Sequence, residues 1–422
     1  MWIIYECLLT AVFLFFLPYM IFRAVISPRE WLERAGIYAG KENYTGKGAV
    51  WVHASSIGET RAALTLVKHL KKELPGRDIL LSTVTRNGNA VAKKSASGVK
   101  VIFVPLDLKL FVKNALRKFK PAVLVLMETE IWPNLIRECS AAGVPVMIAC
   151  GRISKRSFKR YRALKGFFRS VLEGVKVFSM QTGCDAGRII ELGAVPGRVS
   201  VTGSLKYDLA NDAGSLFKSR KEIKEVLGFP EDSRVIVAGS TRKGEEELVI
   251  SAYLEAKAEF PSLCLLIAPR HVSRIREIEL LLRKSRLNYH KRTEDGGKIP
   301  AGRQVLLLDT VGELLSLYPA ADIVFVGGSI VPVGGHNLLE PALAGASVVF
   351  GPHMDNFMEI SELFTKAGAA IKVDGGKELS AAFLCLLKDP GLRESMGKRA
   401  GEVIKENAGS VNKNVELLKG ML

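Results

Sequence analysis

The sequence lacks paired cysteines and lacks histidines at the spacing of metal ligands. Its six cysteines are scattered over 422 residues and form no CxxC pair. This distribution argues against a disulfide framework and a structural zinc site, and it fits a reducing compartment. Low-complexity segments and short-period repeats are also missing, and no Asp-x-Asp motif follows a candidate strand, where a metal-dependent nucleotide site would carry one.

Acidic residues are in deficit as well, because 43 Asp and Glu face 60 Lys and Arg and leave a net charge of +17. Such a surplus indicates an anionic partner: nucleic acid, a phosphorylated lipid or a membrane surface. The sequence contains neither a nucleic-acid-binding module nor a platform of basic and exposed aromatic residues, so we expect no nucleic-acid partner. With 48% hydrophobic residues the chain is globular, and its length predicts two domains.

Charged residues are nearly absent from positions 1–26, where Glu6 and Arg23 are the exceptions. About 20 apolar residues span a bilayer, so this segment is long enough to cross one. It has no basic stretch before it and no small-residue cleavage site, which argues against a cleaved signal peptide. A buried core helix is the remaining alternative. Because Arg23, Arg29 and Arg34 come at or after its end, the positive-inside rule predicts a single-pass anchor with all later residues in the cytoplasm.

Short runs of Val, Ile and Leu recur between amphipathic stretches along the rest of the chain. Such runs are typical of strands covered on both faces, and their alternation with helices predicts parallel sheets. A helix is expected at 59–74, with Ala62, Ala63, Leu66, Val67 and Leu70 on one stripe. The expected strands are 49–54, 79–84, 99–104, 121–127, 144–149, 175–180, 199–202, 234–239, 263–268, 304–309, 322–327, 346–350 and 369–373.

Two sets of strands predict an α/β protein with two Rossmann-like, doubly wound domains that face each other across a cleft. Ligands of this fold bind beyond the carboxyl ends of the strands, where the strand order reverses. The predicted parts are an anchor at 1–26, a first domain at 27–205, a linker at 206–220 and a second domain at 221–422.

Acidic residues follow two candidate strands of the first domain. In WVHASSIGET (51–60), Glu59 falls in the first turn of a helix, where the helix dipole favours an ionised carboxylate. It is therefore a candidate general base, although complementing the dipole is an equally good explanation. In METEIWPN (127–134), Glu128 and Glu130 could point the same way because alternate residues of a strand share a face; helix capping is the alternative.

Glycines and cations follow the strands of the second domain. AGSTRKGEEE places Arg242 at a strand-to-helix turn, and IAPRHVSR places Arg270 after another strand. Backbone amides with a cation suit a phosphate group. The turn 309–314 follows a third strand, and the loop GGSIVPVGGHNLLEPA (327–342) runs into a helix with Glu340 placed to accept from ribose hydroxyls.

The segment 155–169 carries seven cations and no acid, with four aromatic residues between them. Basic amphipathic helices with aromatic faces lie on anionic membrane surfaces. We therefore expect anionic membrane lipids to contact the protein through 1–26 and 155–169. A solvated helix with its aromatic residues in the core is the alternative.

Seven segments, taken together, resemble the Kdo (3-deoxy-D-manno-octulosonic acid) transferases, and in particular the lipid A Kdo transferases. They are WVHASSIGE, METEIWPN, GRIS (151–154), TGSLKYD (202–208), GSTRKGEE, APRH and GGHNLLEPA, in the same order along essentially the whole chain. The resemblance implies the GT-B architecture and an inverting, metal-independent transfer of Kdo from CMP-Kdo to lipid A precursor, with no cofactor. It also implies a bacterial inner-membrane protein with its catalytic domains on the cytoplasmic side.

Carried onto this chain, the resemblance implies that Glu59 is the catalytic base. It implies that Glu128 or Glu130, together with Lys206, stabilises the transition state. Two positions depart from the family pattern: Cys150 stands where many relatives have asparagine, and Leu338 where proline is common. The expected CMP-binding residues are Arg242, Pro269, Arg270, Thr310, Val311, Gly312, Glu313, Gly335, His336, Asn337, Leu338, Leu339 and Glu340. Another membrane-associated GT-B enzyme using a UDP-sugar is the nearest alternative, and a sugar-nucleotide epimerase would need no anchor.

Overall fold

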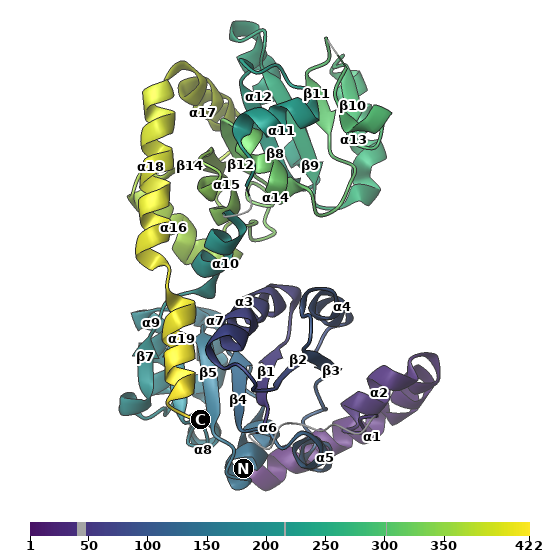
Figure 1. Cartoon of the computed structure of the whole chain (residues 1–422), viewed down its shortest axis with the longest axis vertical. Coiled ribbons are helices and arrows are strands. Elements are labelled where there is room, and N and C mark those ends of the chain that lie inside the picture. The colour runs from purple at the N-terminus through teal and green to yellow at the C-terminus, as the bar shows by residue number, and fades with distance from the viewer. Residues whose placement is uncertain (40–47, 215–216, 301) are drawn as a thin grey trace. The chain divides into compact units, whose positions relative to one another are not determined.

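The computed structural model describes residues 1–39, 48–214, 217–300 and 302–422. The chain divides into two compact units: the first holds Met1–Leu209 and Ala408–Leu422, and the second holds Ala210–Asn407. Within the described residues each unit contains one sheet of seven strands, all pairs parallel (Figure 1). The α/β fold class predicted from the sequence is confirmed.

The first sheet has the order β3-β2-β1-β4-β5-β6-β7 and carries helices on both faces. Its strands are β1 (Val50–Ala54), β2 (Ile79–Thr83), β3 (Lys100–Phe103), β4 (Val123–Met127), β5 (Val146–Gly151), β6 (Val177–Met180) and β7 (Val199–Val201). The helices of this unit are α1 (Trp2–Ile26), α2 (Pro28–Arg34), α3 (Ile57–Glu73), α4 (Arg86–Ser95), α5 (Lys109–Phe119), α6 (Pro133–Ala141), α7 (Lys155–Ala163), α8 (Lys165–Leu172), α9 (Gly183–Glu191), α10 (Leu205–Gly214), which crosses the unit boundary, and α19 (Ser410–Lys419).

Alternating side chains of the strands enter two different cores. In β1, Val50 and Val52 join α3, α4 and α19 on one face, whereas Trp51 joins α5, α6, α8 and α9 on the other. This is the period-two pattern of a strand covered on both faces. The stripe on α3 is buried as the sequence predicted, from Ala62 to Leu70.

The second sheet has the order β10-β11-β9-β8-β12-β13-β14. Its strands are β8 (Val235–Thr241), β9 (Cys264–Pro269), β10 (Tyr289–Lys291), β11 (Val305–Leu307), β12 (Ile323–Val326), β13 (Ser347–Phe350) and β14 (Ala370–Lys372). Its helices are α11 (Arg220–Leu227), α12 (Glu245–Glu259), α13 (Ile275–Lys284), α14 (Leu314–Leu317), α15 (Leu339–Leu343), α16 (Met358–Lys366), α17 (Gly376–Lys388) and α18 (Pro390–Asn407). Every strand of the second sheet except the short edge strand β10 was predicted from an apolar run of the sequence.

The division of the chain differs from the expected one at its C-terminus. The sequence assigned 221–422 to one domain, but α19 packs against α3 and β5 of the first unit (Figure 1). Its buried face, Val411, Val415 and Leu418, completes the core on that side of the first sheet. The expected linker 206–220 is largely helical, with α10 reaching Gly214 and α11 beginning at Arg220; positions 215–216 lie outside the described residues.

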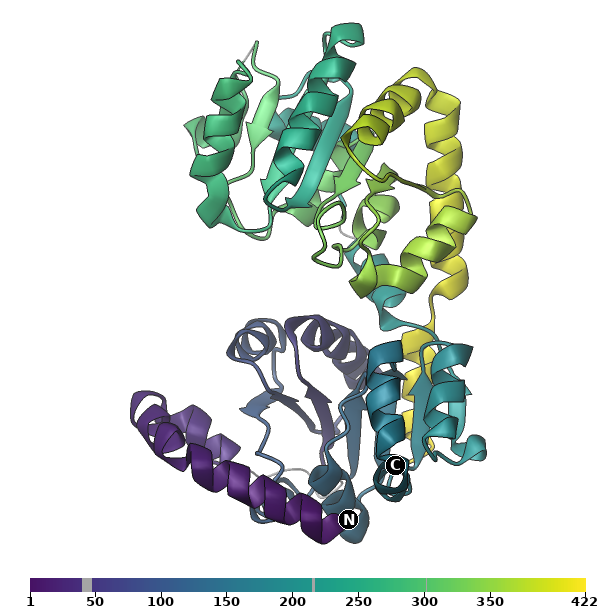
Figure 2. The same ribbon diagram turned by 180° about the vertical axis from the view of Figure 1, so that it is seen from behind.

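The N-terminal helix α1 lies along the outside of the first unit (Figure 2). It is long and apolar enough to cross a membrane, with a mean hydropathy of 2.1, and none of its residues is buried. Its first half nevertheless contacts the unit, since the Tyr5 hydroxyl donates to Asp107 at 2.8 Å and Phe13 stacks edge-on with Phe111. A mostly exposed apolar helix is not the core helix that the sequence left as an alternative.

Candidate active site

The carboxyl ends of β1 and β4 lie side by side, because these two strands are neighbours in the first sheet. The strand order reverses between them, which is where ligands of doubly wound sheets bind. The chain leaves β1 toward Glu59 and leaves β4 toward Glu128 and Glu130. The three carboxylates expected from the sequence therefore share one edge of the sheet.

Glu59 stands in the first turn of α3, and its carboxylate is held by the turn that begins the helix. The hydroxyl of Ser56, the N-cap residue, accepts from the Glu59 backbone N–H at 3.2 Å and donates to Glu59 Oε1 at 2.9 Å. Glu59 Oε2 accepts from the backbone N–H of Ser55 at 2.7 Å. These are the contacts of a capped helix start. They fix the orientation of a side chain that remains partly exposed to solvent.

Glu128 does not follow the strand alternation that the sequence predicted. β4 ends at Met127, and Glu128 has a φ of 54°, so the pleat no longer sets its direction. Burial is the main cause that raises the pKa of Glu128, Lys206 opposes this rise, and the Glu59 carboxylate adds to it. Burial likewise raises the pKa of Glu130, whose Oε2 accepts from the Trp132 indole N–H at 2.8 Å. Glu59 and Glu128 both add to the rise at Glu130, so the three carboxylates form one cluster.

Lys206 and, to a smaller extent, Arg152 supply positive charge beside this cluster. Lys206 stands in the first turn of α10, and its ammonium group lowers the pKa of Glu128. Two residues on, the Asp208 carboxylate accepts from the backbone N–H groups of Gly409 at 2.7 Å and Val411 at 3.2 Å. Asp208 therefore ties the start of α10 to the start of α19. Asp208 lies within the TGSLKYD motif but was not among the residues predicted from the sequence.

His53 on β1 has a structural role. The ring is fully buried, its Nδ1 lies 2.9 Å from the Ser82 hydroxyl, and it packs edge-on against Trp132. Burial lowers the pKa of His53 to about 4, so the ring is neutral at pH 7. It supports Trp132, which in turn holds Glu130.

In the second unit, the strand order reverses between β8 and β12, and four basic side chains gather beyond their carboxyl ends. Arg242 Nη1 lies 2.8 Å from His271 Nε2. Burial, together with the nearby charges of Arg270, Arg242 and His271, lowers the pKa of His336 to about 4. His336 is thus neutral at pH 7 beside two guanidinium groups. The arrangement favours an anion, because two guanidinium groups lie together with two imidazole rings.

Three buried polar atoms of this region have no hydrogen-bond partner within the described part of the chain. They are Thr241 Oγ1, Arg242 Nε and His336 Nε2; Thr310 Oγ1, after β11, likewise has none. Buried polar groups are usually paired, so unpaired ones in a cluster indicate a site for a polar ligand. Among the expected residues, the structure brings Arg242, Arg270 and His336 together.

The glycine-rich loop after β12 already binds a carboxylate of the protein itself. Glu245, fully buried at the start of α12, accepts from the backbone N–H groups of Gly328 at 2.7 Å, Ser329 at 2.9 Å and Ile330 at 3.0 Å. The Glu245 carboxylate also accepts from the backbone N–H of Arg242 at 2.9 Å. These amides are therefore occupied, and a phosphate could approach only through later parts of the loop. This role of Glu245 was not predicted, because GEEE is also the pattern of an ordinary acidic helix start.

Several side chains of the expected nucleotide contacts are buried or have partners within the protein. Leu338 and Leu339 are fully buried in the core, so their side chains are structural. The carboxylate of Glu313 pairs with Arg292 at 2.9 Å, and the Asn337 side chain accepts from the Leu339 N–H at 3.0 Å. The remaining positions divide by exposure: Pro269 and Gly335 are buried, Thr310 and Glu340 are half-buried, and Val311 and Gly312 are exposed.

The basic segment 155–169 forms α7 and most of α8. All seven of its cations are exposed, whereas Phe167 is buried and both Phe158 and Tyr161 pack against the core. Two of the cations have weak surface partners, Arg162 with Glu191 at 3.8 Å and Arg169 with Glu173 at 3.7 Å. The aromatic residues are thus turned inward, as the alternative interpretation expected, and the outer surface is cationic. Glu130 raises the pKa of Tyr161 in addition to burial, so α7 borders the carboxylate cluster.

Solved structures of two enzyme types resemble this chain in fold. A glycosyltransferase from Rickettsia africae matches with a TM-score of 0.60 and 13% identity over 89% of this chain and 99% of that one. A UDP-GlcNAc 2-epimerase from Neisseria meningitidis, bound to UDP-GlcNAc, matches with a TM-score of 0.62 and 14% identity over 88% and 100%. The fold is therefore of the GT-B type, as predicted.

Relatives known by sequence define the class more closely. A 3-deoxy-D-manno-octulosonic acid transferase of Haemophilus influenzae is 32% identical over 92% of this chain and 91% of its own length. One from Bordetella pertussis is 34% identical over 88% and 87%. A bifunctional glycosyltransferase/methyltransferase of Fusobacterium nucleatum is 36% identical over 79% of this chain, which spans about half (52%) of that relative's length.

The chain is a glycosyltransferase by class. Residues 29–209 match the model of the family described as 3-deoxy-D-manno-octulosonic-acid transferase (kdotransferase). Together with the relatives of similar length, this match shows that the chain belongs to the Kdo transferase family.

Proposed function

We propose that the protein transfers Kdo from CMP-Kdo to the lipid A precursor, with inversion at the anomeric carbon and without a bound metal. The observation that carries the proposal is the cluster of Glu59, Glu128 and Glu130 with Lys206 at the strand-order reversal of the first sheet. Family membership supports the sugar, and the carboxylates supply the base that a hydroxyl acceptor needs.

In the proposed reaction, Glu59 takes the proton from the acceptor hydroxyl as its oxygen attacks the anomeric carbon of Kdo. The new bond forms to that oxygen, the bond from the anomeric carbon to the phosphate oxygen breaks, and CMP leaves with the electron pair. Attack from the side opposite the leaving group inverts the anomeric centre. Glu59 suits the role because its oxygens already accept hydrogen bonds that hold the carboxylate in one direction.

For the donor we propose the cationic cluster of the second unit. Arg242 and Arg270 would neutralise the phosphate of CMP, and the unpaired Arg242 Nε and Thr241 hydroxyl would donate to its oxygens. Among the described residues no group of His, Cys, Asp and Glu side chains is arranged to hold a metal ion. In the proposal, guanidinium groups carry the charge stabilisation.

For the acceptor we propose a phosphorylated lipid reached from the membrane. The exposed apolar residues of α1, among them Ile3, Phe15 and Phe22, would enter the lipid phase. The exposed cations of α7 and α8 would face anionic headgroups and the phosphates of the acceptor. We propose the cytoplasmic side of the bacterial inner membrane as the location, with α1 lying along the membrane surface, because Tyr5 and Phe13 hold the first half of this helix against the unit.

A UDP-sugar is the alternative donor, and binding of free nucleotide distinguishes the two. CMP should raise the melting temperature of the purified protein, and UDP at the same concentration should not. If UDP raised the melting temperature and CMP did not, the proposed donor would be a UDP-sugar.

The catalytic assignment is tested by Glu59→Gln in a transfer assay with CMP-Kdo and lipid A precursor. Removing a general base lowers rates by about 10²–10⁴-fold. CMP affinity should stay unchanged, since the nucleotide is proposed to bind the second unit. Glu73→Gln at the far end of α3, where Glu73 pairs with Lys419 on the surface, is the matched control and should retain activity. A Glu59→Gln variant that keeps more than a tenth of the wild-type kcat would contradict the base assignment.

A further inference from the structure

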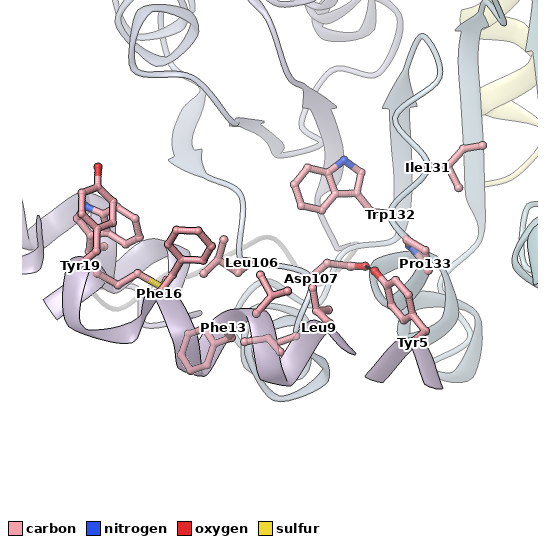
Figure 3. Close-up of a pocket in the computed structure, with 14 residues that line it drawn as sticks. Tyr5, Leu9, Phe13, Phe16, Tyr19, Leu106, Asp107, Ile131, Trp132 and Pro133 are labelled. Carbon is pink, nitrogen blue, oxygen red and sulfur yellow. Dashed lines mark hydrogen bonds between the residues drawn. The ribbon is translucent and has the colours of Figure 1, made fainter. Parts of the chain in front are cut away.

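An apolar pocket lies between α1 and the loops of the first unit that precede α5 and α6 (Figure 3). Its volume is about 460 Å³, within the range of pockets that hold organic ligands. One wall is α1, through Leu9, Val12 and Phe16, and the other includes Leu106, Leu108 and Ile131. A pocket with this lining favours hydrocarbon over any polar group.

The pocket has little polar chemistry to offer a ligand. Asp107 is the one charged residue among the described residues that line it. Its carboxylate already accepts from the Tyr5 hydroxyl at 2.8 Å and from the backbone N–H groups of Asn134 at 3.0 Å and Leu135 at 2.8 Å. Figure 3 shows the Tyr5 hydroxyl directed at Asp107, so this pair joins α1 to the opposite wall.

The pocket adjoins the carboxylate cluster through one side chain. The Trp132 ring lines the pocket, and its indole N–H donates to Glu130 Oε2 at 2.8 Å. A chain inside the pocket would therefore contact the residue that orients Glu130.

The source of the hydrocarbon follows from the wall that α1 provides. The side of α1 away from the pocket exposes Leu8 and Phe15, so the helix that closes the pocket also faces the lipid phase. At its start, Trp2 and Tyr5 contact Phe167, both with ring centroids 5.2 Å apart, and Phe167 belongs to the basic segment 155–169. The first unit thus contains the apolar pocket, the carboxylate cluster and the cations. A lipid with a phosphorylated head would need an apolar site for its chain and cations for its phosphates.

We propose that this pocket holds one acyl chain of the acceptor lipid while the head of that lipid lies at the carboxylate cluster. The inference rests on the proposed function for the identity of the acceptor. It adds that the protein withdraws a chain from the membrane and uses it to position the reacting hydroxyl.

Filling the pocket tests the inference. Leu9→Trp on α1 and Leu108→Trp on the other wall place an indole in the space. Leu8→Trp and Leu110→Trp, at exposed positions one and two residues away in the sequence, are the matched controls. Each buried methylene contributes about fourfold to affinity, so displacing two should lower kcat/KM for the acylated acceptor by about 10-fold or more. Transfer to an analogue with the same phosphorylated head and no long chain should be unchanged, as should CMP affinity. Equal losses with both acceptors would overturn the pocket assignment.

Photo-crosslinking separates a failure of this inference from a failure of the proposed function, because it needs no transfer. Lipid A precursor carrying a diazirine in one acyl chain should label peptides containing 106–108 or 131–133, and Leu9→Trp should abolish that labelling. Equal labelling by a diazirine phospholipid would show that bulk membrane lipid fills the pocket, and absence of labelling by either probe would show that no chain enters. Both results overturn the inference, whereas specific labelling without any Kdo transfer would refute the proposed function alone.

Discussion

The clearest energetic consequence of the structure concerns Glu245 and the glycine-rich loop that it holds. Its two oxygens accept four backbone N–H groups, those of Arg242, Gly328, Ser329 and Ile330, at 2.7–3.0 Å in a fully buried position. In Glu245→Gln one oxygen becomes an NH₂ group, which faces two of these donors. Leaving a buried donor unsatisfied costs about 1–3 kcal/mol, so the substitution should destabilise the second unit by about 2–6 kcal/mol.

Urea unfolding monitored in the second unit measures this loss, and hydrogen exchange at residues 328–330 locates it. The amides should lose protection in Glu245→Gln and keep it in Glu247→Gln, an exposed neighbour on α12 whose substitution should change stability by no more than about 0.5 kcal/mol. If Glu245→Gln were as stable as Glu247→Gln and lost only CMP affinity, then Glu245 would act on the ligand, and the reasoning from its hydrogen bonds would be refuted.

Three further predictions concern the charged groups. Arg270→Ala should weaken CMP binding by about 1.5–3 kcal/mol in calorimetry; unchanged affinity would leave Arg242 as the phosphate ligand. The triple variant Lys159→Glu, Arg160→Glu and Arg162→Glu is made in a protein lacking residues 1–26. It should cosediment less with anionic liposomes and have a higher KM for the lipid acceptor. A folded variant without either change would contradict the role of the basic segment. Lys206→Ala should raise the pKa of Glu128 further, because the Lys206 ammonium group lowers this pKa in the wild type. If catalysis requires ionised Glu128, the acidic limb of the pH profile of kcat/KM should move to higher pH, and Lys206→Arg should restore its position. An unchanged acidic limb in Lys206→Ala would contradict the coupling between the two residues.

The fold was largely predictable because its strands are buried on both faces. Such strands appear in the sequence as short apolar runs. β1 to β9 and β11 to β14 coincide with these runs, although β5, β8 and β9 extend one or two residues further. β10 escaped because it is a three-residue edge strand with the sequence YHK, of which only His290 is buried. The return of α19 to the first unit could not be predicted either, since an amphipathic helix shows that one face is buried but not against which domain it packs.

The candidate site was predictable in position and less so in detail. Residues that follow parallel strands gather at one edge of the sheet, so the sequence alone groups Glu59, Glu128 and Glu130. Partners within the protein could not be read from the sequence. Glu245 looks like an ordinary helix-start acid and instead occupies the loop amides, and Leu338 lies in a ligand-like motif but belongs to the core.

Both units aim their site residues by the same local departure from strand geometry. Glu128 after β4, Cys150 in β5 and Ser240 in β8 have φ values of 54°, 54° and 58°, although residues other than glycine rarely adopt positive φ. In β8 the pairing with β9 shifts between Gly239 and Thr241, which turns Thr241 and Arg242 out of the regular pleat. Gly327 follows the neighbouring strand β12 and lies against this irregularity. Only glycine fits there, because a Cβ atom would come within 2.5 Å of the Ser240 carbonyl oxygen. Lys120 and Arg286, which follow α5 and α13, also have positive φ, at 40° and 55°. The other three stand beside the carboxylates of one unit and the arginines of the other, and a conformation that costs about 1–3 kcal/mol there sets the direction of a side chain that has to act.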